Sequence, residues 1–167
     1  MAIAIVYYSR TGKTKEVVGY IKERLAEKNV AIDVYELKLV REYSRPLHLN
    51  PRLVIDVLFN RLVKYVGDEG FNSRTYDLII LGSPIWIGSI TPPIKSFIAR
   101  YKGLIKAPIV CFTTSAMDGK YSKRFRDLLE SLGYKVAIDF TVVNNINKYR
   151  RVIDEAIENI LKIIKMK

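Results

Sequence analysis

The sequence has little with which to build disulfide bonds or metal centres. Its 167 residues include one cysteine, Cys111, and one histidine, His48. A single cysteine excludes an intramolecular disulfide and any metal site built from several cysteines. A single histidine excludes a histidine-rich metal centre and any catalytic site that needs two histidines. We therefore predict no metal site and expect Cys111, which lies inside an apolar run, to be a small buried hydrophobic residue.

Long apolar runs and blocks of like charge are also missing. No apolar run reaches the roughly 18 uncharged residues that a membrane-spanning helix needs, and no five or six like charges follow one another. The apolar residues 2–8 have no basic segment before them and meet a polar turn, unlike a signal peptide. With 49% hydrophobic and 27% charged residues, the composition predicts one globular domain over residues 1–167, located in the cytoplasm.

The charge balance, in contrast, is strongly basic. Lys and Arg number 28 and Asp and Glu 17, for a formal net charge of +11 at pH 7. A positive field of this kind attracts nucleic acid, anionic membrane surfaces, or acidic proteins and ligands. The basic residues are nevertheless scattered along the chain, which is equally typical of an ordinary solvated surface. We do not expect a nucleic-acid partner from the charge alone.

Short apolar runs alternate with longer amphipathic segments along the chain. Because parallel strands need a crossover between them, this alternation predicts an α/β fold with an open, doubly wound five-stranded parallel sheet and helices on both faces. The expected strands cover residues 2–8, 30–37, 77–81, 107–113 and 134–143, and the expected helices cover residues 13–27, 94–101, 120–132 and the chain from about 149.

One segment, residues 41–76, is longer than an ordinary crossover between strands. Leu53, Val57 and Leu58 begin an apolar pattern with helical spacing, which continues through Leu62 to Val66. We interpret the segment as the second crossover enlarged by a loop over residues 41–50, and not as a separate domain.

The loop after the first strand is rich in hydroxyl groups and opens a helix. A glycine, hydroxyls and backbone N–H groups at a helix start favour an anion such as a phosphate group, although an ordinary capped helix has the same features. The pattern is no Walker A motif, since Tyr7 stands where that motif needs glycine. The candidate binding residues in this loop are Ser9, Arg10, Thr11, Gly12, Lys13 and Thr14.

Two further loops follow the third and fourth expected strands, whose carboxyl ends are where open sheets bind ligands. The first is apolar and holds the only tryptophan, which suits a flat aromatic ring or simple packing at the sheet edge. The second is small and polar, as in a ring contact or a helix-capping loop. The candidates are Ser83, Pro84, Ile85, Trp86, Ile87 and Gly88 in the first loop, and Thr113, Thr114, Ser115 and Gly119 in the second.

Together these loops resemble those of the flavodoxin-like family. Residues 9–14 match its phosphate loop and residues 76–88 its first ring loop, while residues 113–119 stand at the place of the second. The resemblance implies strand order 2-1-3-4-5 and one non-covalently bound FMN. It also implies that the phosphate lies on residues 9–14 and the isoalloxazine between residues 83–90 and 113–119.

The resemblance implies an FMN flavoprotein that acts in electron transfer or as an NAD(P)H/quinone-type oxidoreductase. We find no catalytic side chain near the loops, because the flavin brings its own redox chemistry. An acidic redox protein or NAD(P)H is the expected electron donor, since this chain is basic where typical flavodoxins are acidic. The alternative is a flavin-free module whose basic surface binds nucleic acid or an acidic protein. Whether the chain is a monomer or a homodimer stays open.

Overall fold

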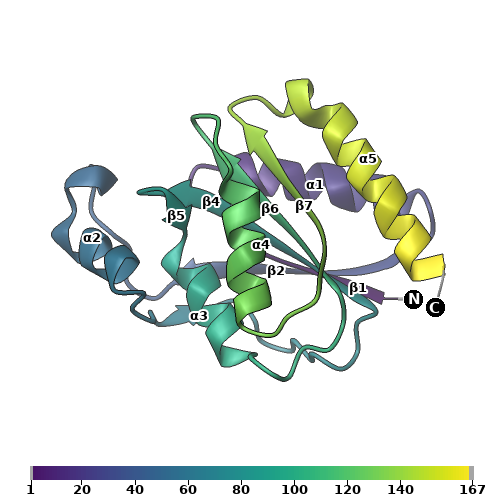
Figure 1. Cartoon of the computed structure of the whole chain (residues 1–167), viewed down its shortest axis with the longest axis horizontal. Coiled ribbons are helices and arrows are strands. Elements are labelled where there is room, and N and C mark those ends of the chain that lie inside the picture. Colours follow the sequence, from purple (N-terminus) through teal and green to yellow (C-terminus); the bar gives the residue numbers. More distant parts are fainter. Residues whose placement is uncertain (1, 166–167) are drawn as a thin grey trace.

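The computed structural model describes residues 2–165 and shows a central sheet between two layers of helices (Figure 1). Most expected elements are present within a few residues of their predicted bounds. The strands are β1 (Ala2–Tyr8), β2 (Ala31–Leu39), β3 (Tyr65–Val66), β4 (Leu78–Trp86), β5 (Ser89–Ile90), β6 (Ile109–Ser115) and β7 (Val136–Val143); the helices are α1 (Lys13–Ala26), α2 (Pro51–Leu58), α3 (Pro92–Arg100), α4 (Tyr121–Ser131) and α5 (Ile146–Lys165), with a 3-10 turn, η1 (Leu47–Leu49).

The five long strands form a parallel sheet in the order β2-β1-β4-β6-β7. This order is the predicted 2-1-3-4-5, because β4, β6 and β7 are the third, fourth and fifth long strands along the chain. The short strands β3 and β5 add antiparallel pairs to β2 and β4. The sheet is therefore the predicted one with two small extensions.

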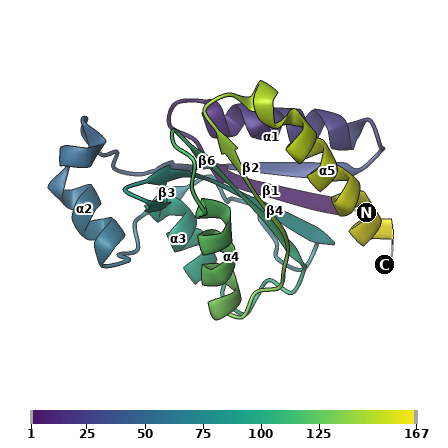
Figure 2. The same cartoon turned by 45° about the horizontal axis from the view of Figure 1, so that its top comes forward.

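Alternating side chains divide the core into two apolar layers, as expected for strands buried on both faces. Ile3, Ile5 and Ile80 pack on one face beneath α1 and α5. Val6 and Leu81 point to the other face, where α3 and α4 cover them. Figure 2 shows these two pairs of helices on opposite sides of the sheet.

The segment 41–76 differs from its prediction. Its helix α2 ends at Leu58 and does not continue to Val66, because Asn60 has a φ of 49°, in the left-handed region. The chain then returns as β3, in which Tyr65 and Val66 pair with Leu39 and Lys38 of β2. The predicted helical pattern therefore contains a helix, a turn and a strand.

The strand β4 is also longer than predicted. The sequence places its end before Gly82, whereas the strand continues to Trp86 and turns back into β5. Both turn residues have positive φ, 50° at Ile87 and 72° at Gly88, as a two-residue hairpin requires. The expected open loop after this strand is thus a short hairpin.

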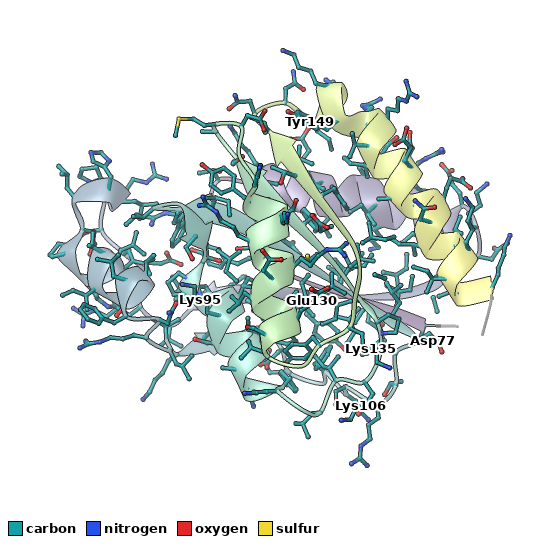
Figure 3. All side chains as sticks on the ribbon, viewed as in Figure 1. Asp77, Lys95, Lys106, Glu130, Lys135 and Tyr149 are labelled. Carbon is teal, nitrogen blue, oxygen red and sulfur yellow. The ribbon has the colours of Figure 1, made fainter. Side chains whose placement is uncertain are left out.

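Helix α2 stands away from the two helical layers, beyond the end of the sheet where β1 and β4 finish (Figures 1 and 2). Lys95 of α3, labelled in Figure 3, joins α3 to the chain after α2. Its Nζ donates to Asn60 Oδ1 at 2.7 Å and to the Val57 carbonyl at 3.4 Å. Over residues 2–165 we find no helix long and apolar enough to cross a bilayer and no acidic, His or Cys cluster able to hold a metal ion.

Candidate functional site

The loop after β1 brings backbone N–H groups to the carboxyl edge of the sheet. Gly12, at the N-cap position of α1, has a φ of 89°, which glycine adopts without strain, and contributes no side-chain cap. Ser9 Oγ accepts a hydrogen bond from the Lys15 N–H at 3.3 Å, which fixes the loop against the first turn. Because the first N–H groups of a helix have no partner within it, this terminus can receive an anion.

Two buried threonines join this loop to the end of β6. Thr14 Oγ1 and Thr114 Oγ1 lie 2.8 Å apart, at hydrogen-bond distance. The contact connects the start of α1 with a strand 100 residues further along the chain. The first and third predicted loops are therefore neighbours, as the sheet order requires.

Arg10 connects the same loop to the segment 41–76. Its Nη2 donates to the Tyr43 carbonyl at 2.8 Å, and its guanidinium lies 5.8 Å from the centre of the Trp86 ring. Its other terminal nitrogen, Nη1, is buried and has no hydrogen-bond partner within residues 2–165. Since buried polar groups are nearly always hydrogen-bonded, this N–H group indicates a missing acceptor.

The indole of Trp86 is held in place by two tyrosines. Its ring meets Tyr8 edge-on with 5.3 Å between centroids, and Tyr43 with 6.0 Å. Burial and the nearby Glu42 carboxylate raise the pKa of Tyr8, whose hydroxyl donates to Glu42 Oε2 at 3.4 Å. Tyr8 therefore stays neutral at physiological pH. The packing leaves Trp86 with 9% of its surface exposed, in a fixed orientation.

Arg10, Thr14, Trp86 and Thr114 line a cavity of about 280 Å³ at the carboxyl ends of β1, β4 and β6. Its two charged lining residues, Arg10 and Lys13, are both cations. Threonine hydroxyls lie beside them, and Trp86 belongs to an apolar wall. The lining residues are Arg10, Thr11, Lys13, Thr14, Leu47, Pro84, Ile85, Trp86, Thr114, Ser115 and Ala116.

No protein-family model matches the chain, and no curated protein matches it. Solved structures do. A flavoprotein in complex with FMN from Lactobacillus acidophilus is 23% identical, with a TM-score of 0.71 over 84% of this chain and 92% of that one. A flavodoxin from the domain Archaea is 15% identical, with a TM-score of 0.63 over 98% and 99%. The rubredoxin oxygen:oxidoreductase of Desulfovibrio gigas is 14% identical, with a TM-score of 0.67 over 99% of this chain and 36% of that one. The chain has a flavodoxin-like fold.

Within this flavodoxin-like fold, many of the predicted binding residues line the cavity and others do not. Ser83 is fully buried, and its hydroxyl is occupied by Thr91 and the Pro84 carbonyl. Thr113 points to the opposite face of β6 from Thr114 and bonds Thr141 Oγ1 at 3.0 Å. The remaining predicted residues outside the cavity lining are Ser9 and Gly12 in the first loop, Ile87 and Gly88 in the hairpin turn, and Gly119, which packs beside Tyr121.

Sequence reasoning did not find Leu47, Ala116 or Tyr43. Leu47 reaches the cavity from η1, and Ala116 lies within the third predicted loop. Tyr43 contacts Arg10 and Trp86. No local motif marks Leu47 and Tyr43, because only the folding of residues 41–50 brings Leu47 to the cavity and Tyr43 against Arg10 and Trp86, which line it.

Proposed function

We propose that the chain binds one FMN in this cavity and transfers electrons through it. The observation that carries the proposal is the arrangement of the lining. The lining combines a helix N-terminus, threonine hydroxyls and two cations with the apolar side chains of Trp86, Pro84 and Ile85. A phosphate group suits the polar and cationic residues, and a flat heteroaromatic ring suits the apolar ones. FMN carries both groups.

The first loop fits the phosphate end of FMN. The N–H groups at the start of α1 and the Thr11 hydroxyl are donors, the paired hydroxyls of Thr14 and Thr114 lie beside them, and Lys13 adds a positive charge. The buried Nη1 of Arg10, without a partner among the described residues, is a further donor in the same loop. In our proposal these donors hold the phosphate on residues 9–14.

The apolar lining residues fit the ring. The isoalloxazine would lie between residues 83–90 and 113–119, where Tyr8 and Tyr43 keep Trp86 from turning. Bound FMN supplies the redox chemistry. The protein orients the ring, limits its contact with water and places Arg10 and Lys13 nearby. These cations favour negative charge on the bound cofactor.

The cationic lining and the net charge of +11 also support a choice of partner. We propose that the electron donor is an acidic redox protein or NAD(P)H, because opposite charges raise the rate of encounter. A role as an NAD(P)H/quinone-type oxidoreductase belongs to the same proposal. Location in the cytoplasm stays a prediction, and the choice between a monomer and a homodimer stays open.

Titration with FMN tests the cofactor. Stoichiometric quenching of flavin fluorescence and a shifted visible spectrum are expected. Replacing the exposed Thr11 with Val removes one donor to a charged group, so the Kd should rise about tenfold. Thr75→Val, at an exposed turn away from the cavity, is the matched control and should leave Kd unchanged. A folded protein that binds no FMN would refute the proposal in favour of the flavin-free module.

A further inference from the structure

A second cavity, of about 360 Å³, lies between the end of β2, helix α2 and the chain that leads into β3. Half of its lining side chains are cations and one is acidic. We call it the basic cavity. Its lining residues are Val40, Arg41, Arg52, Asp56, Arg61, Leu62, Val63 and Lys64.

The one acidic group of the basic cavity is already engaged. Asp56 Oδ2 accepts a hydrogen bond from the buried Tyr43 hydroxyl at 2.8 Å and lies 3.7 Å from Arg52 Nε. The Arg52 guanidinium also stacks 4.7 Å from the centre of the Tyr43 ring. Asp56 and Arg52 therefore offset one another, and neither contributes a free charge to the cavity.

The other three cations have no acidic partner. Over residues 2–165, no ion pair involves Arg41, Arg61 or Lys64, and all three side chains are exposed. They come from two stretches, Arg41 after β2 and the other two between α2 and β3, and backbone hydrogen bonds fix these stretches in place. The Val40 N–H donates to the Lys64 carbonyl at 3.2 Å, and the Arg61 N–H to the Asp56 carbonyl at 2.9 Å. Like charges are thus held around one hollow, where their repulsion is relieved by an anion.

We propose that the basic cavity is a phosphate-binding site. Guanidinium groups form paired hydrogen bonds with phosphate oxygens, and lysine adds a third charge. Val40 and Leu62 supply an apolar rim for the organic part of the ligand. The phosphate belongs either to a small organic phosphate or to a lipid head group; Leu58 and Phe59, 66% and 72% exposed nearby in the chain, suit the second source.

The basic cavity is separate from the first cavity but adjoins it through one residue. The Tyr43 carbonyl binds Arg10 of the first cavity, while its ring lies beneath Arg52 of the basic cavity. The two sites share no lining residue. The proposal therefore does not rest on FMN binding, and it can be tested with the first cavity saturated.

The test uses calorimetric titration by inorganic pyrophosphate of the purified protein loaded with one equivalent of FMN, with free FMN removed so that its phosphate does not compete. Arg61→Gln/Lys64→Gln should lower pyrophosphate affinity at least tenfold. These two exposed side chains make no ion pair, so the double variant should fold. The control pair Lys22→Gln/Lys102→Gln, which removes the same charge at exposed sites elsewhere, should change affinity less than twofold. Thr11→Val should not change it, because that residue lines the other cavity.

Sedimentation with vesicles of phosphatidylglycerol, and of phosphatidylcholine as the neutral control, distinguishes the two sources. If pyrophosphate binds and the double variant Arg61→Gln/Lys64→Gln loses that binding, the ligand of the basic cavity is a small phosphate. Binding of anionic vesicles alone, lost in the same variant, identifies a lipid head group. Equal losses of binding in this double variant and in the control double variant Lys22→Gln/Lys102→Gln would show only the effect of the general surface charge. That result, or no binding of either probe, would overturn the proposal.

Discussion

At the residue scale, the missing side chain of Gly82 in β4 leaves room for the ring of Phe112 from the neighbouring strand β6. A Cβ at this position would lie 2.4 Å from Phe112 Cζ and 3.2 Å from Tyr7 Cβ. Phe112 cannot easily withdraw, because its ring is fully buried and stacks on Phe140 with 5.4 Å between centroids. Glycine is therefore required at Gly82 by packing inside β4, whereas the sequence suggests a strand end there.

Gly82→Ala should accordingly lower the free energy of unfolding by about 1–3 kcal/mol, the usual cost of overpacking a core. Gly19→Ala is the matched control. Gly19 is exposed in α1 with nothing within 4 Å of its Cβ position, so alanine should raise stability by roughly 0.5–1 kcal/mol. Urea unfolding of both variants measures the two changes, and equal effects would contradict this account of Gly82.

At the element scale, α2 depends on its neighbours. A helix of eight residues is marginal in isolation. Buried Leu53 and Val57 attach it to the core, and Lys95 binds its end through Val57 and Asn60. Burial lowers the pKa of Lys95, so its charge is held at a cost that these hydrogen bonds offset.

Lys95→Met keeps the apolar stem and removes the donors to α2. Loss of a buried hydrogen-bonding partner costs about 1–3 kcal/mol, so amide hydrogen exchange over residues 51–60 should become roughly tenfold faster or more. Lys102→Met, at an exposed position after α3, is the control and should leave this exchange unchanged. Unchanged protection in Lys95→Met would mean that apolar packing alone holds α2.

The elements also show what the sequence can predict. The five apolar runs predict the parallel strands, because a strand buried on both faces is apolar along its length. The order of these strands follows from the resemblance to the flavodoxin-like family. Leu62, Tyr65 and Val66 fit helical spacing, yet Asn60 turns the chain and pairing with β2 prevails. The three loops that follow β1, β4 and β6 contribute residues to one cavity, as expected for loops at the carboxyl ends of neighbouring parallel strands. Tertiary folding alone brings Leu47 to the first cavity and gathers the cations around the basic cavity, so no local pattern reveals either set of residues.

At the scale of the whole molecule, the positive charge affects the proposed cofactor. Arg10, Lys13 and the net charge of +11 lower the energy of negative charge on a reduced flavin. The second reduction potential of the FMN-loaded protein should therefore be less negative than that of an acidic flavodoxin. Redox titration at low and high salt measures this, and the difference should shrink at high salt. A strongly negative second step at low salt would contradict it.

The small strand β3 affects the tendency of the protein to aggregate at high concentration. Outer strands with unpaired backbone groups can recruit strands from other molecules and start aggregation. Here β3 takes up the pairing of Lys38 and Leu39, and Tyr35 ties residues 70–76 alongside through its contacts with Phe71 and Tyr76. The end of β2 at Lys38 and Leu39 is thus paired within the chain, which leaves fewer backbone groups of this edge strand open to a strand from another molecule. At the opposite edge, the ion pair of Asp139 in β7 with Arg126 places charge on the edge strand, which also opposes strand addition.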